Sequence, residues 1–214
     1  MHASQGLDLP PQYHFYQVDQ HHGLKHDPLL AIVGPRPIGW VSTLDAKKKR
    51  NLAPFSFFNL LSRQPPLLGF VPNGTKDSWL NAEATGEFVW NLVTRPLAEA
   101  MNRTSAEVGH GVDEFELAEL TPAPSVCVAP PRVAESPVAL ECKVTQIIPL
   151  QDVHGSVSKA HLILGQVVAV HISHDVLVDG VYDTAKAQPV LRAGGAGDYF
   201  EILPEGHFHM PRPD

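Results

Sequence analysis

The stretch NLAPFSFFNLLSRQPPLLGF, residues 51–70, sets polar side chains at short intervals in an apolar run and ends in two prolines and a second apolar segment. Its polar members are Asn51, Ser56, Asn59 and Ser62. A strand whose apolar residues pack inward leaves Ser56 and Asn59 on a neighbouring surface, where hydroxyl and amide donors lie beside backbone N–H groups. Such a surface suits a flat ligand that carries a phosphate.

Short apolar runs on both sides of this stretch extend the pattern along the chain. Most are rich in Val, Ile, Phe, Trp and Thr and are bounded by Gly, Pro, Asn or Asp, which is typical of strands. The runs are 29–34, 38–44, 52–58, 66–72, 87–94, 138–150 and 160–173. Their spacing predicts a mainly β fold, either an antiparallel barrel or a sandwich.

The segments between these runs predict helices, a hairpin tip and an extended wrap. Helices are expected over about residues 78–85 and 96–105, where Pro96 suits a first helical position. The cationic sequence DAKKKRN, residues 45–51, predicts a solvated hairpin tip. The proline-rich segment 121–137 favours extended backbone, so we expect it to wrap the surface.

Length and charge limit the classes of function. With 214 residues and 43% hydrophobic content, the chain is expected to form one domain over residues 1–214. Its formal net charge of -7 argues against nucleic acid as a partner, although a local basic pocket for one small anion stays open.

No segment approaches the roughly 20 consecutive apolar residues that span a bilayer. The N-terminal residues 1–16 contain neither a basic region nor an apolar region typical of a targeting signal. We therefore expect a cytoplasmic protein with no membrane partner.

The cysteine and histidine content does not predict a metal site. Cys127 and Cys142 occur in unrelated contexts without a second pair, and both are expected to behave as small, mostly buried apolar residues. The pair His207 and His209 could share one face of a strand, yet no Cys, Asp or Glu joins them at a recognisable ligand spacing.

The sequence GTKDSWLNAEATGEF, residues 74–88, places Thr75, Lys76 and Ser78 at the expected start of a helix. Unpaired backbone N–H groups and the positive end of the helix dipole favour an anion at such a position. Asp77 or Ser78 could equally be only the N-cap of the helix. Taken alone, this segment leaves both interpretations open.

Taken in order, these segments resemble the flavin reductase-like family of FMN-binding split barrels. The resemblance rests on Pro35–Thr43, Asn51–Phe58, Pro65–Leu67 and Lys76–Ser78, and it extends over about residues 28–203. It implies a six-stranded antiparallel split β-barrel of Greek-key type with a few short flanking helices. It also implies a homodimer with FMN in a cleft near the subunit interface.

The resemblance assigns roles to individual residues of the cofactor site. It implies that the isoalloxazine ring lies along Trp40, Val41, Ser42 and Thr43, that the ribityl chain and dimethylbenzene side follow Asn51, Ala53, Pro54, Ser56 and Phe57, and that Lys76 and Ser78 hold the phosphate. A phosphate monoester carries about -1.5 to -2 charges at neutral pH, so one cation with several N–H or O–H donors suits it.

Two further residues are implied by the same resemblance. His161, in HLILGQVVAV, matches a histidine near the nicotinamide or the flavin pyrimidine, where a ring donor could stabilise the reduced flavin; it could equally mark only the entrance of a strand. In LRAGGAGDYFEI, Gly194 and Gly195 would permit a tight turn, and Tyr199 would cover the flavin or a substrate pocket. One extra residue separates the glycines from Tyr199, which departs from the family pattern.

The implied function is an FMN-dependent reductase that takes hydride from NADH or NADPH and supplies reduced flavin or electrons to a partner monooxygenase or another acceptor. A non-enzymatic FMN carrier is the alternative, and bulky Trp40, Trp79 or Tyr199 over the flavin face would favour it. A pyridoxamine-phosphate-oxidase-like activity on a related barrel is a third interpretation. No G-x-G-x-x-G motif opens a helix, so a nicotinamide must stack directly over FMN.

Overall fold

The structure of the protein is a computed structural model that describes residues 13–74 and 76–213. Thr75, expected at a helix start, lies outside the described residues. Residues 1–12, which make up most of the segment predicted to lack a targeting signal, lie outside them as well.

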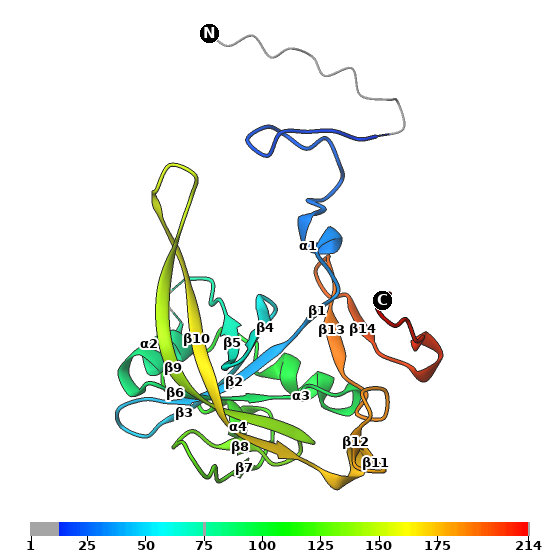
Figure 1. Ribbon diagram of the computed structural model, residues 1–214. Coiled ribbons are helices and arrows are strands. Elements are labelled where there is room, and N and C mark those ends of the chain that lie inside the picture. Colours follow the sequence, from blue (N-terminus) through cyan, green and yellow to red (C-terminus); the bar gives the residue numbers. More distant parts are fainter. Residues whose placement is uncertain (1–12, 75, 214) are drawn as a thin grey trace.

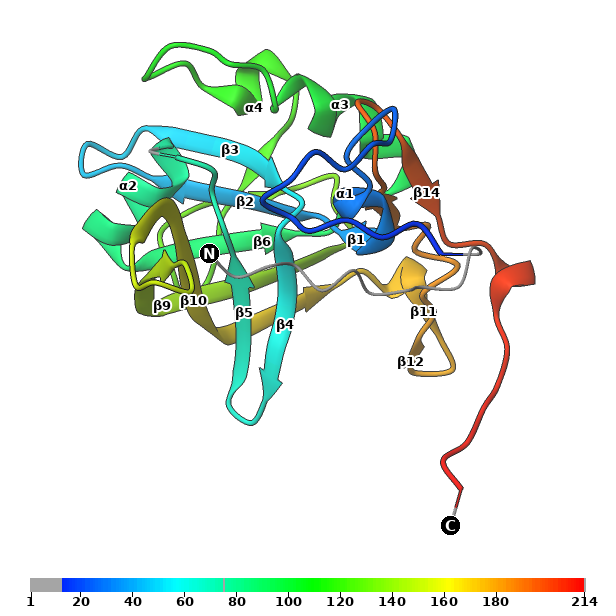
Figure 2. The ribbon, with the colours of Figure 1, turned by 90° about the horizontal axis from the view of Figure 1, so that it is seen from above.

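The main sheet contains seven antiparallel strands in the order β3-β2-β6-β9-β10-β5-β4 (Figures 1 and 2). The strands are β2 (Gly39–Leu44), β3 (Arg50–Phe55), β4 (Phe58–Arg63), β5 (Pro66–Phe70), β6 (Glu87–Asn91), β9 (Val138–Gln151) and β10 (Val157–Ile172). The mainly β, antiparallel prediction is confirmed. The sheet has one strand more than the six expected, because residues 58–63 pair with β5 as a hairpin.

The connection between β3 and β4 determines how the sheet curls. These two strands lie at opposite ends of the strand order, yet only Ser56 and Phe57 separate them along the chain. The sheet must therefore curl until its two edges approach each other at these residues. The edges do not pair with each other, so the barrel stays open along this line.

Two apolar clusters cover opposite faces of strand β2. Val41 belongs to the cluster inside the barrel, with Phe70 and Phe88 among its members. Trp40 belongs to a second cluster, in which Met101 and other residues from the helical side pack against the outside of the sheet. Because alternate side chains of a strand point to opposite faces, β2 is buried along nearly its whole length.

The inner cluster requires close contact between two strands. Gly165 of β10 faces the ring of Phe88, and a Cβ atom at this position would lie 2.3 Å from Cε1 of that ring. Only glycine therefore lets β10 pass over Phe88 without displacing it.

Both predicted central helices are present. Helix α2 (Asp77–Thr85) matches the expected 78–85, and the 3-10 turn η1 (Arg95–Leu97) leads into α3 (Ala98–Arg103), with Pro96 in the first turn. A further helix, α4 (Glu114–Leu117), packs against β3.

The predicted connections are also confirmed. Residues 45–49 form the exposed turn between β2 and β3. The segment 121–137 runs over the surface with only the short strands β7 (Pro122–Ala123) and β8 (Arg132–Val133).

One predicted strand is wrong. Residues 29–34 were expected to form a strand, but Leu29–Ile32 forms the short helix α1. Asp27 accepts a hydrogen bond from the Leu29 N–H group at 2.9 Å, and the apolar side chains of α1 remain exposed. Within the described residues this segment pairs with no strand, and the local hydrogen bond of Asp27 favours a helical start.

Smaller elements surround the barrel (Figure 1). They are the three-stranded sheet of β1 (Arg36–Pro37), β13 (Val190–Arg192) and β14 (Tyr199–Glu201), the hairpin of β11 (Leu177–Val178) and β12 (Val181–Tyr182), and the 3-10 turns η2 (His174–Val176) and η3 (Pro204–Gly206). The far end of the long β9–β10 hairpin projects beyond the barrel. Among the described residues, no helix has the length and apolar character needed to cross a membrane.

Candidate functional site

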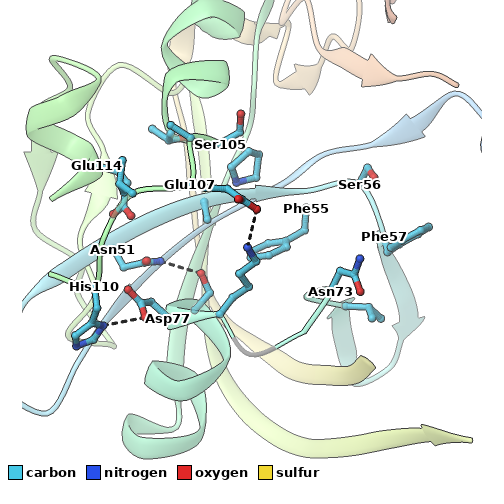
Figure 3. Close-up of a pocket in the computed structure, with 18 residues that line it drawn as sticks. Asn51, Phe55, Ser56, Phe57, Asn73, Asp77, Ser105, Glu107, His110 and Glu114 are labelled. Atoms are coloured by element: carbon cyan, nitrogen blue, oxygen red, sulfur yellow. Dashed lines mark hydrogen bonds and ion pairs between the residues drawn. The ribbon is translucent and has the colours of Figure 1, made fainter. Parts of the chain in front are cut away.

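A pocket of about 560 Å³ opens beside the line where the barrel stays open (Figure 3). Its walls come from the end of β3, the turn to β4, the start of α2 and the loop that follows α3. Most of the predicted cofactor residues line it, namely Asn51, Ala53, Pro54, Ser56, Phe57, Lys76 and Ser78. The fold thus brings the polar residues of the stretch 51–58 together with a helix start about 20 residues later in the chain.

One end of the pocket is formed by the start of α2. Lys76 occupies the N-cap position with extended backbone and provides no side-chain cap. The first N–H groups of the helix therefore keep their capacity to donate to a ligand. Ser78 is buried, and its Oγ accepts a hydrogen bond from Nδ2 of Asn51 at 2.8 Å, which ties the helix start to β3.

The ammonium group of Lys76 is only weakly engaged. Its Nζ lies 3.6 Å from Oε1 of Glu107, a residue whose side chain is 91% exposed. An ion pair at such an exposed position contributes about 0–1 kcal/mol, so an anion of higher charge can replace Glu107. The donors at this end, an ammonium group and helix N–H groups, suit a phosphate.

Two acidic residues that were not predicted as site residues, Asp77 of α2 and Glu114 of α4, also line the pocket. His110 Nδ1 lies 2.9 Å from Asp77 Oδ1, which links the loop after α3 to the first turn of α2 (Figure 3). Glu114 is buried and accepts a hydrogen bond from the Leu52 N–H group at 3.1 Å. Burial raises the pKa of Glu114 above its usual range, even though this hydrogen bond acts in the opposite direction.

The loop residues Thr104–Val108, together with His110, complete the pocket and were missed by sequence reasoning. The sequence feature that could have indicated them is the polar run TSAE, residues 104–107, at the end of the helix predicted over about residues 96–105. Loops held by a rigid scaffold often carry binding residues, but such a run alone does not say which strand it faces.

The four predicted cofactor residues of β2 do not line the pocket. Trp40, Val41, Ser42 and Thr43 are fully buried in β2, which pairs with β3 on one side and, over residues 40–42, with β6 on the other. The side chains already have partners: Trp40 Nε1 donates to Thr104 Oγ1 at 3.0 Å, Ser42 Oγ donates to the Pro131 carbonyl, and Thr43 Oγ1 accepts from Asn81 at 3.0 Å. This central strand pairs with β3, which lines the pocket, but contributes no lining residue itself.

His161, the predicted catalytic residue, lies outside the pocket on β10. Its ring stacks on Trp79 of α2 with ring centroids 4.0 Å apart. His161 Nδ1 and Trp79 Nε1 are both buried and have no hydrogen-bond partner among the described residues. The stack joins β10 to the helix whose first turn forms the pocket.

Tyr199 lines a second cavity of about 250 Å³ next to the first. The two cavities share Pro54, Phe55, Ser56 and Ser105 as lining residues, so they lie on either side of the end of β3. Tyr199 therefore lies beside the predicted cofactor residues without touching the first pocket.

Glycine is required at positions 194 and 195 for different structural reasons. Gly195 has φ +72°, a conformation that other residues rarely adopt. Gly194 does not, but a Cβ atom there would lie 2.7 Å from Cα of Ala31 in α1. The expected turn is confirmed for Gly195, and Gly194 serves close packing.

Comparison with known proteins identifies the family. Residues 34–190 match the family described as "Flavin reductase like domain". The chain belongs to this family. An uncharacterized protein of Halalkalibacterium halodurans is 40% identical over 192 residues, which cover 86% of this chain and 89% of that protein.

Solved structures agree with the fold. Nitrilotriacetate monooxygenase component B from Bacillus cereus has a TM-score of 0.79 and 29% identity, covering 85% of this chain and 90% of that one. A split-barrel protein from Shewanella frigidimarina has a TM-score of 0.75 and 22% identity, covering 86% and 90%. The predicted split barrel of the flavin reductase-like family is thus confirmed.

The described residues contain no group of three or more His, Cys, Asp or Glu that could hold a metal ion.

Cys142 is buried, as predicted, and burial raises the pKa of its thiol. Cys127 is exposed, against the prediction, because it lies in the surface segment 121–137.

Proposed function

We propose that the pocket at the β3–β4 turn binds FMN with its phosphate at the start of α2. Lys76 and the first N–H groups of α2 would hold the phosphate, and Asn51 would keep Ser78 in position at this end. The apolar surfaces of Pro54 and Phe57 would border the ring system. The observation that carries the proposal is this donor set at one end of a pocket of about 560 Å³, a volume in the range of cofactor sites.

The chemistry of the residues present fits this group. A phosphate monoester brings about two negative charges, which exceed the single charge of Glu107 and would displace that weak partner from Lys76. The helix N–H groups donate without carrying a net charge, so the site needs no broad basic patch. This agrees with a formal net charge of -7 for the whole chain.

The reaction that we propose is reduction of flavin by NADH or NADPH. When bound, FMN supplies the redox chemistry by accepting hydride from the nicotinamide. The task of the chain is to hold two flat rings in contact and to keep the space above the flavin free. The second cavity, which shares the β3 end with the first, offers room for the nicotinamide side of the substrate.

The position of three aromatic residues supports a reductase over a flavin carrier. A carrier would be favoured by Trp40, Trp79 or Tyr199 stacked over the flavin face. Among the described residues that line the pocket, none of the three is present. Trp40 is in the core, Trp79 stacks on His161, and Tyr199 borders the second cavity.

The partners belong to the proposal as well. We propose that reduced flavin or its electrons pass to a monooxygenase or another acceptor in the cytoplasm, since a similar solved structure is a monooxygenase component B. We also propose a homodimer, because the single chain leaves large apolar side chains exposed on β4 and at the N-terminal side, among them Leu60, Leu61, Tyr13 and Phe15.

A comparison of FMN with riboflavin tests the proposed phosphate site. Lys76→Ala should weaken FMN binding by about 10- to 100-fold, because a hydrogen bond to a charged group contributes about 1.5–3 kcal/mol. Riboflavin lacks the phosphate, so its Kd should stay the same in parent and variant. Flavin fluorescence quenching measures both constants.

Lys47→Ala removes a cation from the exposed β2–β3 turn and serves as the matched control. It should leave both constants unchanged. An unchanged FMN Kd in Lys76→Ala would remove Lys76 from the phosphate site, and equal weakening of both flavins would assign Lys76 to the folding of α2.

A further inference from the structure

Two arginines occupy paired positions on neighbouring strands, and one of them, Arg192, lines the second cavity. Arg36 of β1 and Arg192 of β13 are direct partners in the antiparallel register. Side chains of directly paired residues extend on the same face of a sheet, and like charges in this arrangement destabilise it. An anion bound next to both residues would relieve this repulsion.

The hydrogen bonds of the two guanidinium groups supply only neutral partners. Arg36 donates to the carbonyl groups of Leu30, Val33 and Ala193, and Arg192 donates to those of Asp198, Gly195 and Ala196. Neither forms an ion pair with a carboxylate of the described residues. Arg50, Arg95 and Arg103, by contrast, each have an acidic partner.

Arg192 keeps donors for a ligand. Its Nε–H and one Nη1–H have no acceptor among the described residues, since its hydrogen bonds to Asp198, Gly195 and Ala196 use one donor of Nη1 and two of Nη2. The three carbonyl contacts fix the plane of the guanidinium, and Tyr199 stacks against it at 4.8 Å. A cation held in one orientation binds an anion with less loss of side-chain entropy.

Both arginines border the proposed flavin site. Arg192 lines the second cavity together with Asn102 and Tyr199, and that cavity shares Ser56 with the first pocket. The guanidinium of Arg36 lies 6.0 Å from the ring centroid of Phe57, a lining residue of the first pocket. The two arginines, which have no acidic partner among the described residues, thus lie on the other side of the end of β3 from Lys76.

We propose that Arg192, with Arg36 beside it, binds the phosphate groups of the nicotinamide dinucleotide. The inference rests on the proposed function, because it assigns the second cavity to the reductant of the same site. The pyrophosphate of NADH carries two negative charges next to each other, which matches two adjacent guanidinium groups. Arginine binds phosphate oxygens with paired N–H groups, whereas the flavin phosphate has its own cation in Lys76.

Binding of NAD⁺ to the FMN-loaded protein tests this assignment without turnover. Arg192→Gln should raise the Kd for NAD⁺, measured by isothermal titration calorimetry, by about tenfold, as expected for the loss of one charge-assisted contact. Arg192→Lys keeps the charge and should lie between the parent and Arg192→Gln. Arg95→Gln is the matched control, because Arg95 is already paired with Glu201.

Two electron donors separate a charge effect from a structural effect. With NADH, Arg192→Gln should raise KM by about tenfold. With 1-benzyl-1,4-dihydronicotinamide, which has the same ring but no phosphate, the rate should equal that of the parent. This uncharged donor therefore reports whether the turn at residues 195–198 and the ring site are intact.

The results that would overturn the inference are distinct from those that would overturn the proposed function. An unchanged Kd for NAD⁺ in Arg192→Gln, or an equal loss with both donors, would assign Arg192 to the turn alone. Failure of the parent protein to reduce FMN with either donor would reject the reductase function. The NAD⁺ titration would still decide the role of Arg192 in that case.

Discussion

Glu114 places a buried carboxylate in the wall of the proposed FMN pocket. Its protonation state affects the stability of the folded protein. Burial raises its folded-state pKa above the usual 4.5, so the ionised form is disfavoured in the folded protein. The resulting loss of folding stability is absent below pH 4.5 and develops as the pH rises through the folded pKa of Glu114.

Glu114→Gln should therefore stabilise the protein at pH 7, since the amide keeps an acceptor for the Leu52 N–H group without a charge. Thermal unfolding from pH 4 to pH 8 should give a melting temperature above that of the parent at pH 7 and equal to it near pH 4. Glu116→Gln, on the exposed side of α4, is the control and should show no such trend. A variant less stable than the parent at pH 7 would contradict the assignment.

His161 remains a predicted catalytic residue, and its contact with Trp79 provides the competing explanation. His161→Ala should slow the reduction of bound FMN by about tenfold or more, while the FMN Kd changes little. Stopped-flow absorbance and fluorescence titration measure the two quantities. Equal reduction rates combined with a lower melting temperature would instead assign His161 to the packing of α2 against β10.

At the residue scale, sequence reasoning found the parts of the pocket that local chemistry marks. Lys76 and Ser78 stand at a helix start, which favours an anion but also fits a plain N-cap, so the family resemblance was needed to assign them to the phosphate. Ser56 was predicted because it interrupts an apolar run. The resemblance placed Trp40 to Thr43 along the ring through their backbone and hydroxyls, which stays a prediction. A motif does not reveal that both edges of β2 are paired and that these side chains are buried. His110 was missed because it meets Asp77 only through the tertiary fold.

At the scale of elements, one buried acid holds the surface segment 121–137 to the barrel. Glu141 of β9 is fully buried and accepts hydrogen bonds from the N–H groups of Val126, Cys127 and Val128. His171 of β10 lies 2.5 Å from the same carboxylate. Burial acts to raise the pKa of Glu141, but these hydrogen bonds outweigh burial and hold it below its ordinary value.

Glu141→Gln should destabilise the protein by about 3 kcal/mol at pH 7, because the amide nitrogen meets N–H donors and the charge is lost. The stabilisation by Glu141 is present above pH 4.5 and is lost as the pH falls through the lowered folded pKa. The difference in stability between the parent and Glu141→Gln should therefore become smaller in acid. Urea unfolding of both proteins at pH 7 and pH 4 measures this difference. Glu135→Gln, an exposed acceptor in the same segment, is the control; equal stability of parent and Glu141→Gln at pH 7 would refute this role.

The elements themselves were largely predictable, because apolar runs and helix-start signals are local. The two exceptions have tertiary causes. Strand β4 was not separated from the stretch 51–70 because its strand character depends on pairing with β5. The apolar run at 29–34 contains α1 and pairs with no strand of the described part of the chain.

At the scale of the whole molecule, the place of residues 51–70 in the barrel explains their mixed pattern of polar and apolar residues. It contains both edges of an open barrel, joined by Ser56 and Phe57, and these two residues border the proposed flavin pocket. The sequence predicted a barrel but not which strands form its open line, since strand order depends on contacts far apart in the chain. The exposed apolar surface that we assign to a homodimer belongs to this scale as well, and a solution mass of twice 23.3 kDa is the expected result.

The most direct test of the reductase proposal is an anaerobic titration of the FMN-loaded protein with NADH, followed at the visible absorption band of the flavin. The account predicts that the band bleaches rapidly and reaches its end point at one NADH per bound flavin. A bound flavin that stays oxidised with both NADH and NADPH would contradict it and would leave the carrier function, and a protein that binds no flavin would reject the proposed site.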